Sequence, residues 1–380
     1  MLEKRILKYY LGLLLICAFI TLSITLLMPV SSFNTQYLNN TVLVKGISFD
    51  TIKWSFRSGY YGQWQPLAWI SHAIDFTVFG EDLALHRVSG VILHLLTATI
   101  FFIFLIKVTS DGMRALVATT VFALHPIQLE TLIDPTLRGV LVGAPLALLT
   151  MLIYQAATKK NSVTKYLMML ILFIVTLMAS AAFVVLPFIL ILIDIWPLSR
   201  FKRHGVSAVK YQGRGWIPLE GLSIYDLFIE KLPFFAISVV STFFSNLIDL
   251  AWRHSAHIEI QSTFYNLLDT FGWCLLYFAR SWGPLVTSSY AIKTTTLPIW
   301  LNLIAMFFVF AISYFVSVRF WKAPYLFVGW FSFLLFLLPF MPILRCAGGV
   351  GADGIMYTAM LPFSIVLTWS VFNLAQKNIK

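Results

Sequence analysis

The chain has 380 residues, of which 59% are hydrophobic and only 11% are charged. A soluble domain uses about 25% charged residues, so this composition excludes a soluble globular protein and indicates a membrane protein with many spans. The formal net charge of +11 does not indicate nucleic acid as a partner, because Lys and Arg stand at the ends of the apolar segments, as membrane topology requires.

Ten apolar segments are candidates to cross the hydrocarbon core of a bilayer, which is about 30 Å thick. In chain order they cover residues 9–29, 85–106, 114–133, 137–157, 165–182, 183–198, 232–251, 298–318, 324–344 and 356–374. A weaker segment at 264–283 contains Asp269 and Arg280, and we interpret it as interfacial or re-entrant. The sequence therefore predicts an all-α integral membrane protein with about 10 transmembrane helices, or 11 if the weak segment also crosses.

Basic residues mark one side of the predicted membrane. They gather before the first span, in the longest interior loop at 199–231 and at the end of the chain. The positive-inside rule then places both termini in the cytoplasm, and the predicted location is a bacterial inner membrane. We expect one transmembrane domain over 1–380, with outward regions at 30–84 and 252–297. The three widely separated cysteines indicate neither a metal site nor a disulfide framework.

The first outward region contains two amphipathic stretches, at 49–56 and 64–79. The second has apolar side chains at Leu67, Ile70, Ile74 and Phe79. Helices of this kind lie in the headgroup plane of a membrane. We therefore expect two interfacial helices that form the floor of a pocket for a lipid-linked donor.

Several motifs follow one another along the chain. Residues 63–94 lead from an aromatic, proline-bearing segment into a span that carries His86 and His94. Three further motifs read FALHPIQLE (122–130), LPFILILIDIWPL (186–198) and EKLPF (230–234). In this order they resemble the multi-span GT-C glycosyltransferases, specifically the protein O-mannosyltransferase-like branch, in which many members also carry TPR repeats. These 380 residues contain no TPR repeat.

The resemblance implies a GT-C bundle and a reaction that releases a polyprenyl phosphate. Such enzymes need basic side chains for the phosphate, and a carboxylate that acts as base or binds a divalent cation. Relatives typically supply acids in a Tyr-Asp-Asp motif, but residues 31–37 here read SSFNTQY. Three further motifs also depart from the family pattern: a basic-acidic motif is Arg138-Gly139-Val140, a Lys-Pro turn is SAAF at 180–183, and a late Asp-Arg-Tyr is DGI at 353–355.

These departures favour a catalytically degenerate protein that binds lipid or serves as a structural subunit of a membrane complex. The alternative is an active enzyme that moves a mannose-like sugar from a polyprenyl-phosphate donor to a protein or glycan on the outer face. A transporter of the lipid-linked sugar is a third, weaker interpretation, because no matched pair of broken helices is visible. The expected partners are membrane lipids, including polyprenyl phosphate, and other membrane proteins. A divalent cation is expected only for the active form.

Candidate site residues follow from these roles. If the chain is active, the catalytic acids are Asp75, Glu130 and Asp50. Lipid-phosphate binding is assigned to Arg138, Arg280 and Arg345, which can grip phosphate with two donors, together with His94, His125 and Trp64. Asp353 and His86 are weak metal candidates. Each has a simpler interpretation: a histidine at a span end commonly bonds to backbone, Asp75 with His72 could form the solvated face of an interfacial helix, and Asp194 is interpreted as structural, paired with Arg200.

Overall fold

The computed structural model describes residues 2–27, 40–159, 162–201, 223–255, 263–282, 298–341, 344 and 356–378. Over these residues the protein is built from helices and contains no β-strand. In the described part of the chain, six helices are long and apolar enough to cross a membrane. They are α1 (Leu2–Leu27), α4 (His86–Thr109), α7 (Arg138–Lys159), α11 (Leu232–Ser255), α13 (Ile299–Val318) and α15 (Met356–Asn378).

Four shorter apolar helices account for the other predicted spans. They are α5 (Gly112–Leu124), α8 (Val163–Ala179), α9 (Leu186–Ile195) and α14 (Pro324–Leu337), with 3-10 turns η6 (Ala181–Val185) before α9 and η8 (Leu338–Phe340) after α14. An all-helical protein with several candidate spans is thus confirmed. The count of ten crossings depends on these shorter helices and stays a prediction.

The predicted span 114–133 is wrong in its extent, because the helix breaks in the middle. Helix α5 ends at Leu124, and α6 (Gln128–Ile133) starts a separate short turn of helix. The cause is Pro126, which disfavours helical conformation at the residue before it. His125 is accordingly extended, with φ −67° and ψ 127°.

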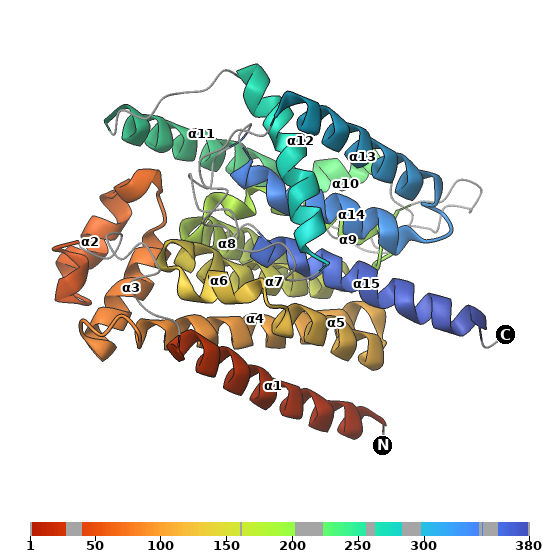
Figure 1. Ribbon diagram of the computed structural model, residues 1–380, viewed down its shortest axis with the longest axis horizontal. Coiled ribbons are helices and arrows are strands. Elements are labelled where there is room, and N and C mark those ends of the chain that lie inside the picture. Colours follow the sequence, from red (N-terminus) through yellow and green to blue (C-terminus); the bar gives the residue numbers. More distant parts are fainter. Residues whose placement is uncertain are drawn as a thin grey trace.

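The remaining elements are short or lie outside the long bundle. They are η3 (Leu43–Lys45), α2 (Phe49–Arg57), η4 (Tyr60–Gly62), α3 (Pro66–Phe79), η5 (Pro135–Leu137), α10 (Ile224–Glu230) and α12 (Thr263–Arg280). In Figure 1 the ends of α1 and α15 that carry the termini lie at the same end of the molecule, and α2 and α3 lie at the opposite end. Helix α12 crosses the direction of α13 and α15 in this view.

Small residues on α7 allow the centre of the bundle to pack closely. Gly139, Gly143 and Ala147 repeat every four residues, so they share one helix face. A Cβ added to Gly143 would lie 2.2 Å from the ring of Phe183. Close backbone approach over small residues is the usual way in which helices associate in lipid. It brings α7 against α8, α4 and η6, and this packing positions the site described next.

Candidate functional site

A buried ion pair joins helices α3 and α7 near the end of the molecule that holds α2 and α3. Arg138 Nη2 lies 2.6 Å from Asp75 Oδ2, and the two side chains are 5% and 3% exposed. Arg138 is the first residue of α7, whereas Asp75 lies in the second half of α3. Two residues that the sequence assigns to different roles, catalysis and phosphate binding, therefore neutralise each other.

Helix α4 completes this site with a hydroxyl and a carbonyl. The Ser89 hydroxyl donates to Asp75 Oδ2 over 2.8 Å, and Arg138 Nη1 donates to Ser89 Oγ over 2.5 Å. Arg138 Nη2 also donates to the carbonyl of His86 over 2.8 Å. Burial raises the pKa of the Asp75 carboxyl, while Arg138 and Ser89 oppose the rise by stabilising the carboxylate. Within this hydrogen-bond network, the charges of Asp75 and Arg138 compensate each other.

His72 lies on the same buried face of α3, one turn before Asp75. Its side chain is fully buried, and its Nε2 lies 3.1 Å from the carbonyl of Pro135. Burial, with Arg138 nearby, holds the pKa of His72 well below its usual range. The residue is therefore a neutral imidazole that links α3 to η5, the turn directly before α7. His72 and Asp75 are both buried inside the protein. They therefore form neither the solvated face of an interfacial helix nor the open floor of a pocket.

Gly139 shows that the packing leaves no room for a further side chain beside Arg138. A Cβ at this position would lie 2.3 Å from Gln65 Oε1 and 2.5 Å from the carbonyl of Ala179. Gln65 is itself buried, at the N-cap of α3. The space beside Gly139 is thus filled by the amide of Gln65, at the position where the resemblance predicts a charged residue.

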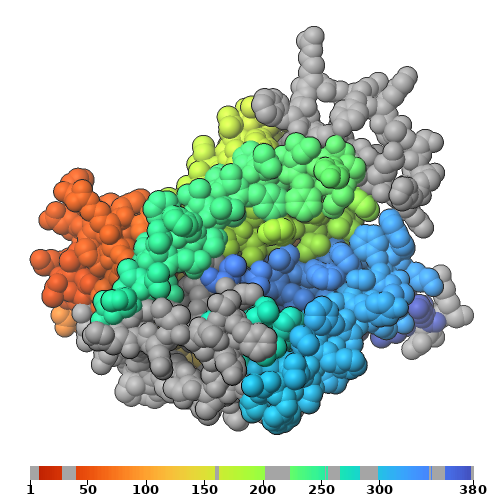
Figure 2. Space-filling model, turned by 90° about the horizontal axis from the view of Figure 1, so that it is seen from above, coloured from red at the N-terminus to blue at the C-terminus, as the bar shows by residue number. Residues whose placement is uncertain are grey.

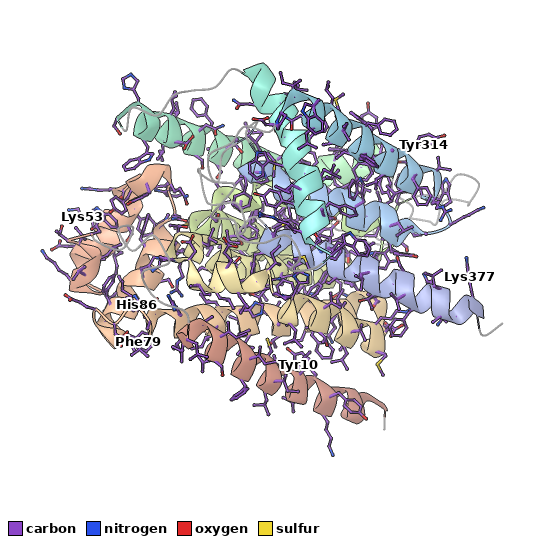
Figure 3. The ribbon with its side chains drawn as sticks, viewed as in Figure 1. Tyr10, Lys53, Phe79, His86, Tyr314 and Lys377 are labelled. Carbon is purple, nitrogen blue, oxygen red and sulfur yellow. The ribbon has the colours of Figure 1, made fainter. Side chains whose placement is uncertain are left out.

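The three candidate histidines lie apart from one another. His94 is fully buried in α4, with Nδ1 3.0 Å from Tyr357 Oη and Nε2 3.1 Å from the carbonyl of Ala123. His86 Nε2 lies 2.9 Å from the carbonyl of Gly80, and Figure 3 places this ring beside Phe79. His125 is half-buried, and burial lowers its pKa. His86 thus bonds to backbone, as the simpler interpretation predicts, whereas His94 bonds both to backbone and to the side chain of Tyr357.

The other candidates lie on other elements than Asp75 and Arg138. Asp50 is exposed on α2, and Glu130 is half-buried on α6. Arg280 is buried near the end of α12, with its guanidinium 6.0 Å from the ring centre of Tyr277. Trp64 donates from Nε1 to the carbonyl of Phe56 over 3.0 Å. Arg345, Asp353 and the stretch 31–37 lie outside the described residues.

Metal ligation was a weak assignment for His86. Over the described residues, no three His, Cys, Asp or Glu side chains come together as ligands would. His86 contributes its backbone carbonyl to Arg138 instead. Its role at this site is therefore that of a hydrogen-bond acceptor for the ion pair.

A second buried polar cluster joins the motifs at 186–198 and 230–234. Asp194 accepts from Arg200 over 2.8 Å and from Lys231 over 2.6 Å, and Arg200 also reaches Glu230 over 2.8 Å. The Tyr154 hydroxyl lies 2.6 Å from both oxygens of Asp194. The pairing of Asp194 with Arg200 is confirmed, whereas the contributions of Lys231 and Tyr154 were missed.

The charges in this second cluster balance, two carboxylates against two cations. Burial favours a higher pKa for Glu230, but Lys231 and Arg200 outweigh it and hold the pKa below its usual value. Arg200 and Lys231 border the interior loop at its two ends, on either side of residues 202–222. The cluster therefore fixes both ends of this loop to the bundle.

The motif EKLPF at 230–234 was a signal for these missed contacts, because two adjacent charges stand directly before an apolar span there. No comparable local signal marks Ser89 or Gln65. No family model, curated protein or solved structure matches this chain. The resemblance to GT-C enzymes therefore stays an expectation from the sequence motifs alone.

Proposed function

We propose that this protein is a non-catalytic membrane protein with a GT-C-like bundle, and that it works as a structural, lipid-contacting subunit of a larger membrane assembly. The single observation that carries the proposal is the buried pair of Asp75 and Arg138. A general base must reach the proton of its acceptor, and a phosphate-binding arginine must reach the phosphate. In this protein the Asp75 carboxylate and the Arg138 guanidinium instead bind each other.

Two further features support the same proposal. Gln65 fills the space beside Gly139, so the packing excludes a larger residue at a position where the resembled enzymes carry a charge. His94 is engaged at both ring nitrogens inside the core. Residues that resemble the scaffold motifs thus serve packing, which is what a fold retained without its reaction requires.

The experiment is a glycosyl-transfer assay on the purified full-length protein in nanodiscs. Polyprenyl-phosphate mannose and glucose are the donors, and peptide and glycan mixtures are the acceptors. We expect no turnover above that of empty nanodiscs. Turnover that disappears in Asp75→Asn or Glu130→Gln would overturn the proposal and establish the active enzyme.

Asp50→Asn is the third test variant, because Asp50 is the remaining candidate acid. Asp50 is exposed on α2, so its replacement tests a candidate acid with little structural cost. Loss of a measured activity in this variant alone would also refute the non-catalytic proposal, because it would identify the base.

A further inference from the structure

An apolar groove lies between the outward segment and two helices of the bundle. Its volume is about 760 Å³, within the range of roughly 300–1,000 Å³ that is usual for small-molecule sites. It is bounded by the end of α2, the segment after it, the last turns of α8 and one face of α11. The lining residues are Phe56, Arg57, Trp64, Ile174, Leu177, Met178, Ala236, Ile237, Val240, Ser241, Phe244 and Ile248.

The groove has the length of one leaflet. Its α11 wall runs from Ala236 to Ile248, which at 1.5 Å per residue is roughly 18 Å. One leaflet contributes about 15 Å of hydrocarbon, half of the bilayer core. Figure 2 shows α11 (green) extended along this face, with its far end beside the segment 40–84 (orange). In an acyl chain that follows α11, the end that joins the headgroup would therefore lie near α2.

Among the described residues that line the groove, one side chain is charged. It is Arg57, the last residue of α2, which is exposed; the other described lining side chains are apolar, apart from Ser241. No carboxylate is among these described lining residues. Guanidinium binds phosphate through two parallel donors, while the apolar walls match a hydrocarbon chain.

Helix α2 also has the form of a headgroup-level helix. Phe49, Ile52 and Phe56 are exposed along one stripe, whereas Thr51 and Ser55 face the protein. Exposed apolar residues on a short helix with charged neighbours are typical of the membrane interface. At that depth Arg57 would lie level with lipid phosphates.

From these features we infer that the groove binds one acidic phospholipid of the outer leaflet, with an acyl chain between α8 and α11 and its phosphate on Arg57. The inference rests on the proposed function in one respect, that the chain is a lipid-embedded protein whose outward pocket performs no transfer. It deepens that function by naming the lipid and its site.

Native mass spectrometry of the full-length protein tests the site. The protein is purified in detergent with equal amounts of phosphatidylglycerol, phosphatidylcholine and undecaprenyl phosphate. We expect retention of phosphatidylglycerol above the neutral lipid. In Arg57→Gln that retention should fall about fivefold, the effect of one basic residue near a lipid surface, about 1 kcal/mol. Val240→Trp should reduce it at least as much by filling the groove.

Two matched controls lie beside these positions. Lys53→Gln removes a cation one turn earlier on α2, and Val239→Trp adds the same bulk on α11; neither residue lines the groove, and both are exposed. Both controls should retain lipid as the wild type does. Equal retention in all five proteins would overturn the site, as would equal losses in the controls.

Two other outcomes would contradict the identity of the ligand. Equal retention of phosphatidylcholine would mean that Arg57 confers no selectivity, and preferential retention of undecaprenyl phosphate would replace the phospholipid with an isoprenoid. Each outcome leaves the transfer assay unaffected, so failure of the lipid site is separable from failure of the proposed function.

Discussion

Asp75 and Arg138 satisfy each other inside the protein, together with Ser89 and the carbonyl of His86. Breaking a buried pair by removing one partner costs about 3–5 kcal/mol, because the other charge stays buried without compensation. At the residue scale, each of these two charges therefore has a structural role, because it compensates the other.

A double-mutant cycle measures whether the two charges act as a pair. Asp75→Asn and Arg138→Gln should each destabilise the protein by about 3–5 kcal/mol. The double variant should lose about 1–3 kcal/mol less than the sum of the two, since neither charge is then left alone. Denaturant titration in mixed micelles gives these free energies of unfolding.

The control is a less buried pair of the same residue types, Asp111 with Arg114, which are 3.2 Å apart and whose side chains are 39% and 16% exposed. Arg114→Gln should cost less than the Arg138 substitution, because water screens a partly exposed ion pair more than a fully buried one. Additive effects of the two substitutions at 75 and 138 would mean that the pair is absent in solution.

His72 predicts a dependence of stability on pH. Its pKa is lowered by burial in the folded protein, whereas the unfolded chain binds the proton near pH 6.5. Protonation therefore favours the unfolded state, so stability present above pH 6.5 is lost as pH falls below it, by at most about 1.4 kcal/mol per pH unit. The pKa of Asp75 is raised in the folded protein. Protonation of Asp75 therefore favours the folded state at lower pH, which is opposite to the effect of His72.

His72→Asn isolates this contribution, because an amide can still donate to the Pro135 carbonyl but takes up no proton. The variant should lose less stability than the wild type between pH 7 and pH 5. Unfolding midpoints across this range test it, and identical slopes in the two proteins would contradict a buried neutral imidazole.

At the scale of elements, the sequence predicts the apolar segments well and their ends less well. The ten predicted segments correspond to helices, because a helix satisfies all backbone hydrogen bonds of an apolar segment in lipid. Pro126 splits one of them into α5 and α6. The partners Asp194 and Arg200 were predictable because they are six residues apart. Asp75 and Arg138 lie 63 residues apart, and no local pattern encodes that contact.

The cluster of Asp194, Arg200, Glu230 and Lys231 fixes α9 to the start of α11. Lys231→Met should destabilise the protein by about 3–5 kcal/mol, because two buried carboxylates would then share one cation. Lys322→Met, at an exposed position, should change the free energy of unfolding by less than about 0.5 kcal/mol. Equal midpoints for the two variants in the same titration would show that the cluster contributes nothing to stability.

For the whole molecule, the arrangement of the helices predicts where the termini lie. The terminal ends of α1 and α15 share one end of the molecule, opposite α2 and α3 (Figure 1). Epitope tags at both ends should therefore be protected together in right-side-out cells and exposed together in inverted vesicles. A tag at one end that is accessible from outside, with the other protected, would refute an even number of crossings.

At the scale of the whole molecule, two candidate spans leave much of their apolar surface uncovered. Helices α11 and α13 are each only 22% buried over their apolar span. Phe243, Phe307 and Tyr314 are exposed on them, and Figure 3 shows Tyr314 at the outer edge of the molecule. Lipid covers such faces in a monomer, and a second membrane protein can cover them through van der Waals packing.

Purification at native expression level in a gentle detergent, followed by crosslinking and mass spectrometry, shows whether the protein acts as a subunit. We expect a complex in which one other membrane protein copurifies in stoichiometric amount and crosslinks to this chain. A monodisperse monomer without a partner would contradict this expectation.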